Sequence, residues 1–166
     1  MSDDLTKTFT VDATPERVYD AINDVRAWWG GLVGRNDDVG QEWVYFVPDI
    51  HFSKFRTTEL VPGKRIAWLV TDSELSFLKD KQEWTGTTVE FDLSEVDGGT
   101  QVLFTHRGLT PQVECFEVCD LAWDEYIVGS LQRYITEGIG APNSIEGDEE
   151  VEAARARRDA GGVAVG

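Results

Sequence analysis

The sequence predicts an α+β domain in which a curved antiparallel sheet wraps around a long C-terminal helix. Three observations support this fold. An apolar stripe with helical spacing runs from Pro111 to Glu137, a series of strand-like segments precedes it, and two short helical patterns follow the first strand. Strands joined by hairpins, with the helices segregated from them, are typical of α+β proteins rather than parallel α/β proteins.

The long helix is predicted from apolar residues that recur at every fourth position. Residues three and four apart share one face of a helix, so these side chains form one stripe. Thr110 suits an N-cap and Pro111 suits the first turn, while Gly138 and Pro142 predict the end of the helix. The stripe consists of Trp123, Ile127, Leu131 and Ile135, widened by Phe116, Cys119, Tyr126 and Tyr134.

The strands are predicted from alternation and from turn signals. Leu5 to Val11 alternates and reads as the first strand, followed by a short helix with Thr14 as N-cap and Pro15 at its first position. Val25 to Trp29 reads as a second short helix, and Leu32 to Gly40 as a loop. The later strands are expected at Glu42 to Val47, Phe52 to Leu60, Arg65 to Thr71, Thr85 to Val96 and Gln101 to Arg107.

Alternation within these strands also predicts which side chains face the helix. The inward set is bulky and mostly apolar, which favours a pocket between sheet and helix that takes a small hydrophobic or aromatic molecule. Trp28 and Trp29 end a short helix beside a Gly-rich loop and are expected at the entrance. The candidate ligand-binding residues are Trp28, Trp29, Ile66, Trp68, Val70, Val89, Phe91, Phe104, His106 and Trp123.

Composition limits the classes of partner. The chain has 166 residues, 41% of them hydrophobic, and contains no apolar run of about 18 residues, so we expect one domain and no membrane span. The N-terminus lacks the pattern of a signal peptide, so a cytoplasmic location is expected. The net charge of −16 argues against nucleic acid and anionic membranes as partners. No cofactor motif is recognised.

His106 is the one titratable group expected on the inner face. An imidazole there suits ligand binding or acid–base chemistry, but a histidine hydrogen-bonded to the helix or to a buried water is the more common reason for this pattern. His51 is expected to be exposed at a turn. Cys115 and Cys119 are interpreted as small buried hydrophobes, because a helix holds side chains four apart in poor geometry for a disulfide. No metal-ligand spacing is present.

The composition changes after Pro142. Residues 144–166 are first acidic, then basic, and have no apolar period. We therefore expect an acidic, mobile C-terminal tail at 144–166 that follows a domain at 1–143.

Several motifs, in order, resemble a known family. Thr14 to Ile22 resembles the helix opening of the START-like (SRPBCC) superfamily. Trp28-Trp29 before a Gly-rich loop, Glu59 to Ile66 and Thr105 to Leu109 resemble the branch related to the C-terminal domain of the heat-shock-protein-90 ATPase activator. The resemblance covers roughly residues 5 to 140 and implies the helix-grip fold.

The resemblance leaves three functions open, because fold does not imply function. The first is a non-catalytic module that binds a small hydrophobic or aromatic ligand. The second is a polyketide cyclase- or hydratase-like enzyme that uses His106 with a buried carboxylate such as Glu59 or Glu114. The third is a chaperone-interacting domain, which would use an exterior face. A protein partner and a homodimer therefore stay open as well.

Overall fold

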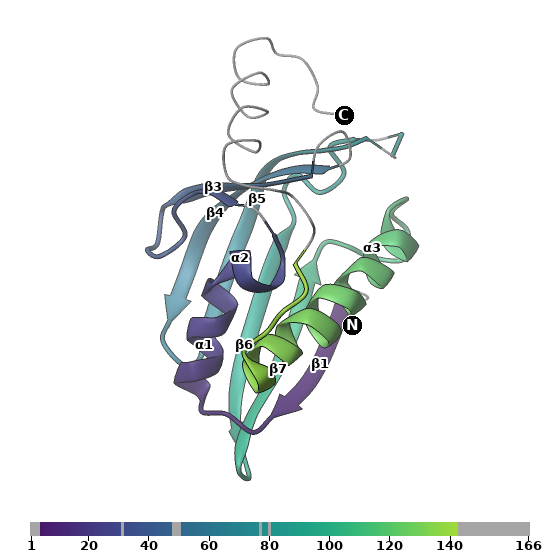
Figure 1. Cartoon of the computed structure of the whole chain (residues 1–166). Helices are drawn as coiled ribbons and strands as arrows, with labels where there is room; N and C mark the ends of the chain where they lie inside the picture. The colour runs from purple at the N-terminus through teal and green to yellow at the C-terminus, as the bar shows by residue number, and fades with distance from the viewer. Residues whose placement is uncertain (1–3, 31, 48–50, 77, 80, 143–166) are drawn as a thin grey trace.

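The computed structural model describes residues 4–142 except 31, 48–50, 77 and 80 (Figure 1). Its strands form one antiparallel sheet in the order β1-β7-β6-β5-β4-β3-β2, and the helices pack on one face of it. The elements are β1 (Leu5–Val11), α1 (Pro15–Asn23), α2 (Val25–Trp28), β2 (Leu32–Gly34), β3 (Glu42–Val47), β4 (His51–Val61), β5 (Arg65–Leu75), β6 (Thr88–Val96), β7 (Gly99–Arg107), α3 (Phe116–Trp123), the π-helical η1 (Asp124–Leu131) and α4 (Gln132–Glu137). The predicted α+β helix-grip fold is confirmed.

The first half of the chain follows its local signals closely. β1 and β3 have the predicted bounds, and the Thr14 hydroxyl caps α1 by accepting a hydrogen bond from the Arg17 amide at 3.2 Å. The loop expected at Leu32 to Gly40 instead begins with the edge strand β2, which pairs with β3. Three residues ending in glycine carry too little alternation to predict a strand. Pro48-Asp49, a pair that predicts a turn between two of the strands, lies outside the described residues.

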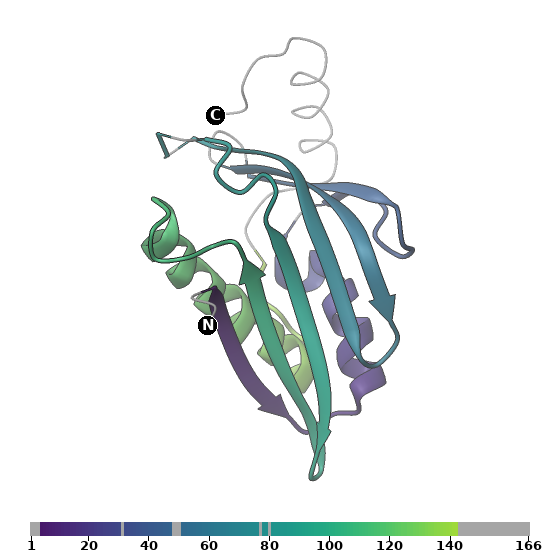
Figure 2. The ribbon, with the colours of Figure 1, turned by 180° about the vertical axis from the view of Figure 1, so that it is seen from behind.

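The inner face of the sheet is built from large side chains that oppose one another across strands. Phe91 pairs with Phe104 across β6 and β7, and Val89 pairs with His106. Ile66 and Trp68 continue the layer on β5. Two register shifts between β4 and β5 break the regular pairing, and such bulges increase the bend and twist of a sheet. The curved sheet can therefore enclose a helix (Figure 2).

The long helix begins at Phe116, five residues later than predicted. Residues 111–115 form turns, and Thr110 does not cap the helix. The carboxylate of Glu83, in the β5–β6 connection, accepts hydrogen bonds at 2.9 Å from the amides of both Glu114 and Cys115. An acidic group from another part of the chain therefore satisfies donors next to the helix start, and sequence spacing alone could not show this.

The middle of the helix is π-helical. Residues four apart in an α-helix overshoot a full turn, because the turn holds 3.6 residues, and a stripe with strict four-residue spacing drifts around the helix. A π-helix has wider turns, since its hydrogen bonds join i to i+5. The change to π geometry over η1 offsets this drift. It keeps the residues at every fourth position buried, namely Cys115, Cys119, Trp123, Ile127, Leu131 and Ile135.

The helix ends as the glycines predict, and the chain then returns along α2. Gly138 adopts the left-handed conformation with φ of 79°, which terminates α4. The buried Ser130 hydroxyl donates to the Trp28 carbonyl oxygen at 2.7 Å and accepts from the Ala141 amide at 2.6 Å. A Cβ on Gly140 would lie 2.2 Å from the Ala27 carbonyl oxygen, so this approach requires glycine.

The two cysteines differ from the expectation. Both are buried in the core as predicted, but the structure joins their sulfur atoms in a disulfide. The prediction of two separate thiols assumed that Cys115 lies inside the helix. It lies instead at the N-cap of α3, with a Cα–Cα distance of 5.6 Å to Cys119, within the range that disulfides span.

Of the described helices, none combines the length and apolar character needed to cross a membrane.

Burial of the stripe predicts the cost of shortening it. Ile127→Ala removes a fully buried side chain between helix and sheet and should lower the free energy of unfolding by about 2–5 kcal/mol in urea denaturation. Leu121→Ala, on the exposed side of the same helix, should change it by less than about 0.5 kcal/mol. Similar small effects from both substitutions would contradict the assigned helix face.

Candidate functional site: an aromatic pocket beside the long helix

A pocket of about 290 Å³ lies between the first half of the long helix and the adjoining ends of β3, β4 and β5. Its wall is almost entirely apolar or aromatic. The lining residues are Trp29, Tyr45, Val47, His51, Leu75, Trp84, Val118, Cys119, Ala122, Trp123 and Tyr126.

Stacked aromatic rings hold the wall in place. Trp29 stacks on Tyr45 with ring centroids 3.8 Å apart, and its ring lies 5.0 Å from that of Trp123. Trp84 stacks on the same Trp123 at 5.9 Å. Four different segments of the chain therefore meet in one aromatic cluster, and ring-to-ring contacts of this kind restrict each side chain to one orientation.

His51 contributes an imidazole to the wall, where the sequence-based expectation placed it at the surface. It is the first residue of β4 and pairs with Val47, so alternation along the strand turns its side chain inward. Its ring packs edge-on against Tyr45 and Trp84, at 5.2 and 4.8 Å between centroids. Burial among these rings lowers the pKa of His51 to about 3, so the imidazole is neutral at pH 7.

Trp84 brings a polar atom without a partner. Its side chain is 3% exposed, and its buried indole Nε1–H has no hydrogen-bond acceptor among the residues that the structure describes. Buried donors in native proteins are nearly always paired with protein, water or ligand. The atom has almost no exposed surface, so it meets a ligand in the pocket only if the Trp84 side chain turns.

His106 lies beneath the pocket and does not line it. The Trp123 indole N–H donates to its Nδ1 at 3.1 Å, so its Nε2 carries the proton and donates to the Thr87 hydroxyl at 2.8 Å. That hydroxyl in turn donates to the Trp84 carbonyl oxygen at 2.6 Å. Burial, and then the neighbouring His51, lower the pKa of His106 to about 3. The arrangement is that of a neutral core histidine with both nitrogens satisfied.

Two of the ten candidate ligand-binding residues, Trp29 and Trp123, line the pocket. The other eight do not. Trp28 is fully buried, and its indole donates to the Ile22 carbonyl oxygen at 3.0 Å, so it forms part of the core rather than the entrance. The remaining seven fill the core between sheet and helix, with no exposed surface: Ile66, Trp68, Val70, Val89, Phe91, Phe104 and His106.

Some of the pocket residues that the sequence analysis did not identify could have been predicted from their spacing in the sequence. Tyr45 and Val47 alternate with Trp43 along β3, which places them on the inner face. Ala122 and Tyr126 neighbour Trp123 on the helix. Trp84 carried no such signal, because it lies in an irregular connection.

Among the residues that the structure describes, no carboxylate lines the pocket. The carboxylates proposed for acid–base chemistry, Glu59 and Glu114, are both exposed. Glu59 forms an ion pair with Arg65 at 2.9 Å, and Glu114 accepts a hydrogen bond from the Lys79 amide. Among the described residues, no three His, Cys, Asp or Glu side chains gather closely enough to hold a metal ion.

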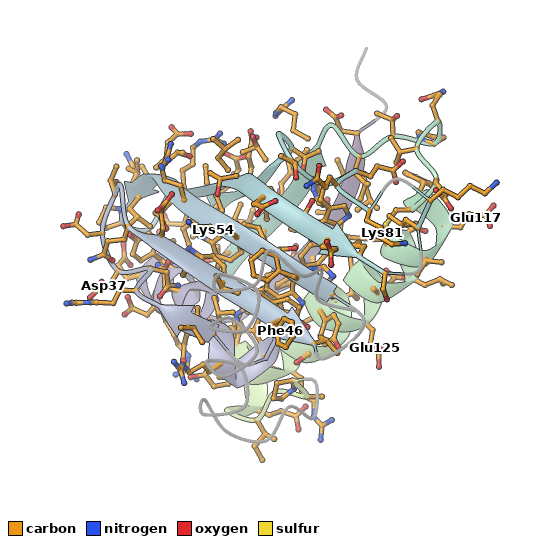
Figure 3. All side chains as sticks on the ribbon, turned by 90° about the horizontal axis from the view of Figure 1, so that it is seen from above. Asp37, Phe46, Lys54, Lys81, Glu117 and Glu125 are labelled. Atoms are coloured by element: carbon orange, nitrogen blue, oxygen red, sulfur yellow. A yellow bond between two sulfur atoms is a disulfide. The ribbon has the colours of Figure 1, made fainter. Side chains whose placement is uncertain are left out.

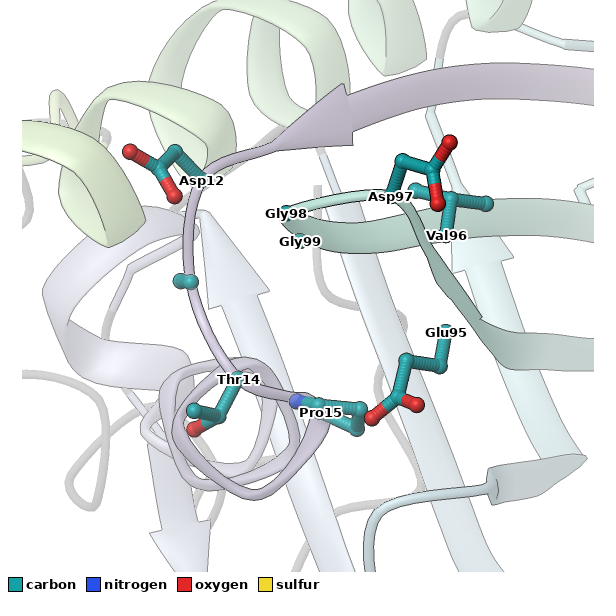
Figure 4. Close-up of a pocket in the computed structure, with 9 residues that line it drawn as sticks. Asp12, Thr14, Pro15, Glu95, Val96, Asp97, Gly98 and Gly99 are labelled. Carbon is teal, nitrogen blue, oxygen red and sulfur yellow. The ribbon is translucent and has the colours of Figure 1, made fainter.

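A larger hollow of about 680 Å³ lies at the opposite end of the sheet, between the β1–α1 connection and the β6–β7 hairpin (Figure 4). It is lined by the carboxylates of Asp12, Glu95 and Asp97, which point in different directions in Figure 4. They do not converge on one point, as ligands of a cation would. This hollow is therefore a poorer candidate site than the aromatic pocket.

Comparison with known proteins supports the fold independently. A family model described as "Activator of Hsp90 ATPase homolog 1-like protein" matches residues 12–136. Among curated proteins the comparison finds no match. The family resemblance predicted from the sequence motifs is confirmed.

Solved structures with this fold come from several sources. The Aha1 dimer from Colwellia psychrerythraea has a TM-score of 0.66 at 22% identity, covering 82% of this chain and 98% of that one. DynU16, from the dynemicin biosynthetic locus, has a TM-score of 0.65 at 16% identity; 86% of this chain matches 51% of that one. CalU16 from Micromonospora echinospora has a TM-score of 0.60 at 16% identity, covering 93% and 83%. At these identities the likeness shows the fold alone.

The buried neutral histidines predict an acid-sensitive fold. With folded pKa values of about 3 against 6.5 when unfolded, the unfolded chain binds more protons below pH 6.5. The free energy of unfolding should therefore fall as pH decreases from about 6.5 toward 3, by up to about 1.4 kcal/mol per pH unit for each histidine.

Long-range ¹H–¹⁵N NMR checks this on the folded protein. His106 should show the Nε2–H tautomer and no titration between pH 8 and 5. Urea denaturation at several pH values gives the number of protons that the chain takes up on unfolding. In a His106→Gln variant this number should be lower by about one. A His106 midpoint near 6.5 would contradict the buried network.

Proposed function

The chain belongs to the family of proteins like the activator of Hsp90 ATPase homolog 1. We propose that its aromatic pocket binds a small uncharged aromatic molecule that carries one hydrogen-bond acceptor. The observation that carries the proposal is the pocket of about 290 Å³ walled by Trp29, Tyr45, Trp84 and Trp123. Its volume is near the lower end of the range for ligand sites, which favours a compact ligand of one or two rings.

The electrostatics of the wall favour a neutral ligand. Its described lining includes no Asp, Glu, Lys or Arg, and its one imidazole, His51, is neutral. A charged ligand would lose its hydration without gaining an opposite charge, which is costly in an apolar site. The net charge of −16 further disfavours anions.

The acceptor on the ligand is inferred from Trp84. Trp84 lines the pocket, and its buried Nε1–H has no partner among the described residues, whereas the Trp123 indole N–H is already bonded to His106. We propose that the Trp84 side chain turns on binding so that this donor faces the ligand. A carbonyl or ether oxygen on an aromatic ligand would complete this donor. Loss of such a bond leaves the donor unsatisfied, so the site should discriminate against analogues that lack the acceptor.

Binding is a better account of this site than acid–base catalysis. His106, the histidine expected to act as acid or base, lies outside the pocket, and both its nitrogens are engaged. His51 contacts the hydroxyl of Ser53, but Ser53 is fully buried, so this pair offers no accessible nucleophile.

A second candidate function is protein interaction, favoured by two exposed apolar side chains on α3, of which Val118 also borders the pocket. Val118 is 54% exposed and Leu121 is 70% exposed. The Aha1 of Colwellia psychrerythraea is described as a dimer, and we propose a second copy of this chain as the partner.

Leu121→Glu should then lower the dimer fraction in analytical ultracentrifugation. A wild-type chain that stays monomeric at every concentration would exclude this candidate.

Filling the pocket should abolish binding without unfolding the domain. Ala122 lines the pocket and is half-buried, so Ala122→Phe places a ring in the void. We expect 2-acetylnaphthalene to quench the tryptophan emission of the wild type, and Ala122→Phe to lose this response. Leu121→Phe adds a ring at the exposed neighbouring position and should bind as the wild type does. Equal binding by both variants would place the probe elsewhere.

The acceptor is tested by comparing two probes of nearly the same shape. Naphthalene, which has no acceptor, should bind more weakly than 2-acetylnaphthalene by about 2- to 10-fold, the value of one net hydrogen bond. In ¹H–¹⁵N spectra the Trp84 indole resonance should shift downfield only with the acetyl compound. Equal affinities of the two probes, with no shift of the Trp84 resonance, would contradict the role of Trp84 as a donor, although the pocket could still bind apolar molecules.

A further inference from the structure

His51 uses one of its two ring nitrogens for a hydrogen bond within the protein. It lines the aromatic pocket from the start of β4, and its Nε2 is hydrogen-bonded to the hydroxyl of Ser53. Figure 3 looks down on the two strands that carry this wall, with Phe46 of β3 and Lys54 of β4 labelled. The Nδ1 of His51 has no hydrogen-bond partner among the residues that the structure describes, so it is the nitrogen left for a molecule in the pocket.

The surroundings of Ser53 decide the direction of the hydrogen bond to His51. Ser53 is buried on the inner face of the sheet, between its register partners Tyr45 and Ser73. Among the described residues, its hydroxyl has no hydrogen-bond partner besides His51. A hydroxyl carries one hydrogen, and a buried donor without an acceptor is costly. The Ser53 hydroxyl therefore donates, and the Nε2 of His51 accepts.

The direction of this bond fixes the tautomer of His51. Its imidazole is neutral at pH 7, because burial lowers its pKa to about 3, and a neutral imidazole carries its one proton on the nitrogen that does not accept. The proton of His51 therefore lies on Nδ1. His106 has the opposite tautomer, since its Nδ1 accepts from the Trp123 indole and its Nε2 donates to Thr87.

We propose that His51 is a specificity-determining residue of the pocket and that its Nδ1–H donates to the carbonyl oxygen of an aromatic ligand. This rests on the proposed function, and it adds the residue that selects among aromatic molecules and the class of acceptor that it selects. Ser53 already orients this donor on the pocket wall, whereas the Trp84 donor must turn before it meets the ligand. The first hydrogen bond to the ligand is therefore that of His51.

The arrangement of donors favours a carbonyl over other oxygen groups. A carbonyl oxygen has two lone pairs, so it can accept from His51 and also from Trp84, whose ring lies 4.8 Å from the imidazole. An aryl ether oxygen is a weaker acceptor, because its lone pair is delocalised into the ring. A phenol brings a hydrogen of its own, for which an Nδ1–H is no acceptor. The favoured ligands are aromatic ketones, aldehydes and carboxamides.

Long-range ¹H–¹⁵N NMR on the ligand-free protein tests the tautomer independently of any ligand. His51 should show a protonated Nδ1 and an unprotonated Nε2, the reverse of His106. Ser53→Ala removes the donor to Nε2 and should shift His51 toward the Nε2–H tautomer. Thr85→Val is the matched control, because it removes a hydroxyl that is bonded to Ser73 at 2.8 Å and not to His51. A protonated Nε2 on His51 in the wild type would overturn the proposal.

Probe binding then tests the specificity. The wild type should bind 2-acetylnaphthalene more tightly than 2-methoxynaphthalene or naphthalene. His51→Phe keeps a ring in the wall, so naphthalene should bind as to the wild type, which also shows that the pocket is intact. The preference of this variant for 2-acetylnaphthalene over naphthalene should fall by about 2- to 10-fold, the value of one net hydrogen bond.

The outcomes separate the role of His51 from the binding function itself. An unchanged preference in His51→Phe would assign the hydrogen bond to Trp84 alone and overturn the role of His51, while the pocket would still bind aromatic molecules. A wild type that binds none of the three probes would overturn both proposals. A readout without a variant comes from the His51 Nδ1–H proton, which should shift downfield with 2-acetylnaphthalene and not with naphthalene; the same shift with both probes would contradict the bond.

Discussion

At the centre of the mostly apolar interface between the long helix and the sheet lies a buried chain of hydrogen bonds that the rest of the structure depends on. The indole of Trp123 donates a hydrogen bond to His106 on β7, and His106 donates to the Thr87 hydroxyl. That hydroxyl donates to the backbone carbonyl oxygen of Trp84. Apolar burial is non-directional and would allow the helix to slide. A satisfied hydrogen-bond chain in a dry core has one geometry, so it fixes both the height and the rotation of the helix.

The pocket follows from this seating. With Trp123 held from below by His106, its ring supports Trp29 on one side and Trp84 on the other. The pocket lies beside this ring cluster, and its rings cannot collapse into the space without breaking their stacking. Trp29 and Trp123 therefore belong both to the core and to the pocket wall.

The sequence was sufficient for the fold because periodicity and turn chemistry are local properties. The strand bounds of β1 and β3, the Thr14 cap and the buried helix stripe could all be predicted from neighbours in the chain. The site could be predicted only in part, because it depends on where curvature leaves a gap. Phe91 and Phe104 have the same pattern whether the space above them is filled or empty. Glu83 and Trp84 act from an irregular connection, and no period reveals their contacts.

The π-helical stretch also says something about how this helix tolerates changes in length. Each four-residue step in an α-helix rotates a side chain about 40° past a full turn, so the stripe from Cys119 to Ile135 would otherwise wind well away from the sheet. In η1 the wider turns take up roughly one residue more than an α-helix needs over the same rise. A chain shortened by one residue at the exposed Gly129 could close that stretch into ordinary α-helix while Trp123 and Ile135 stay in place. A deletion of one residue would then be absorbed in the helix interior rather than in a loop.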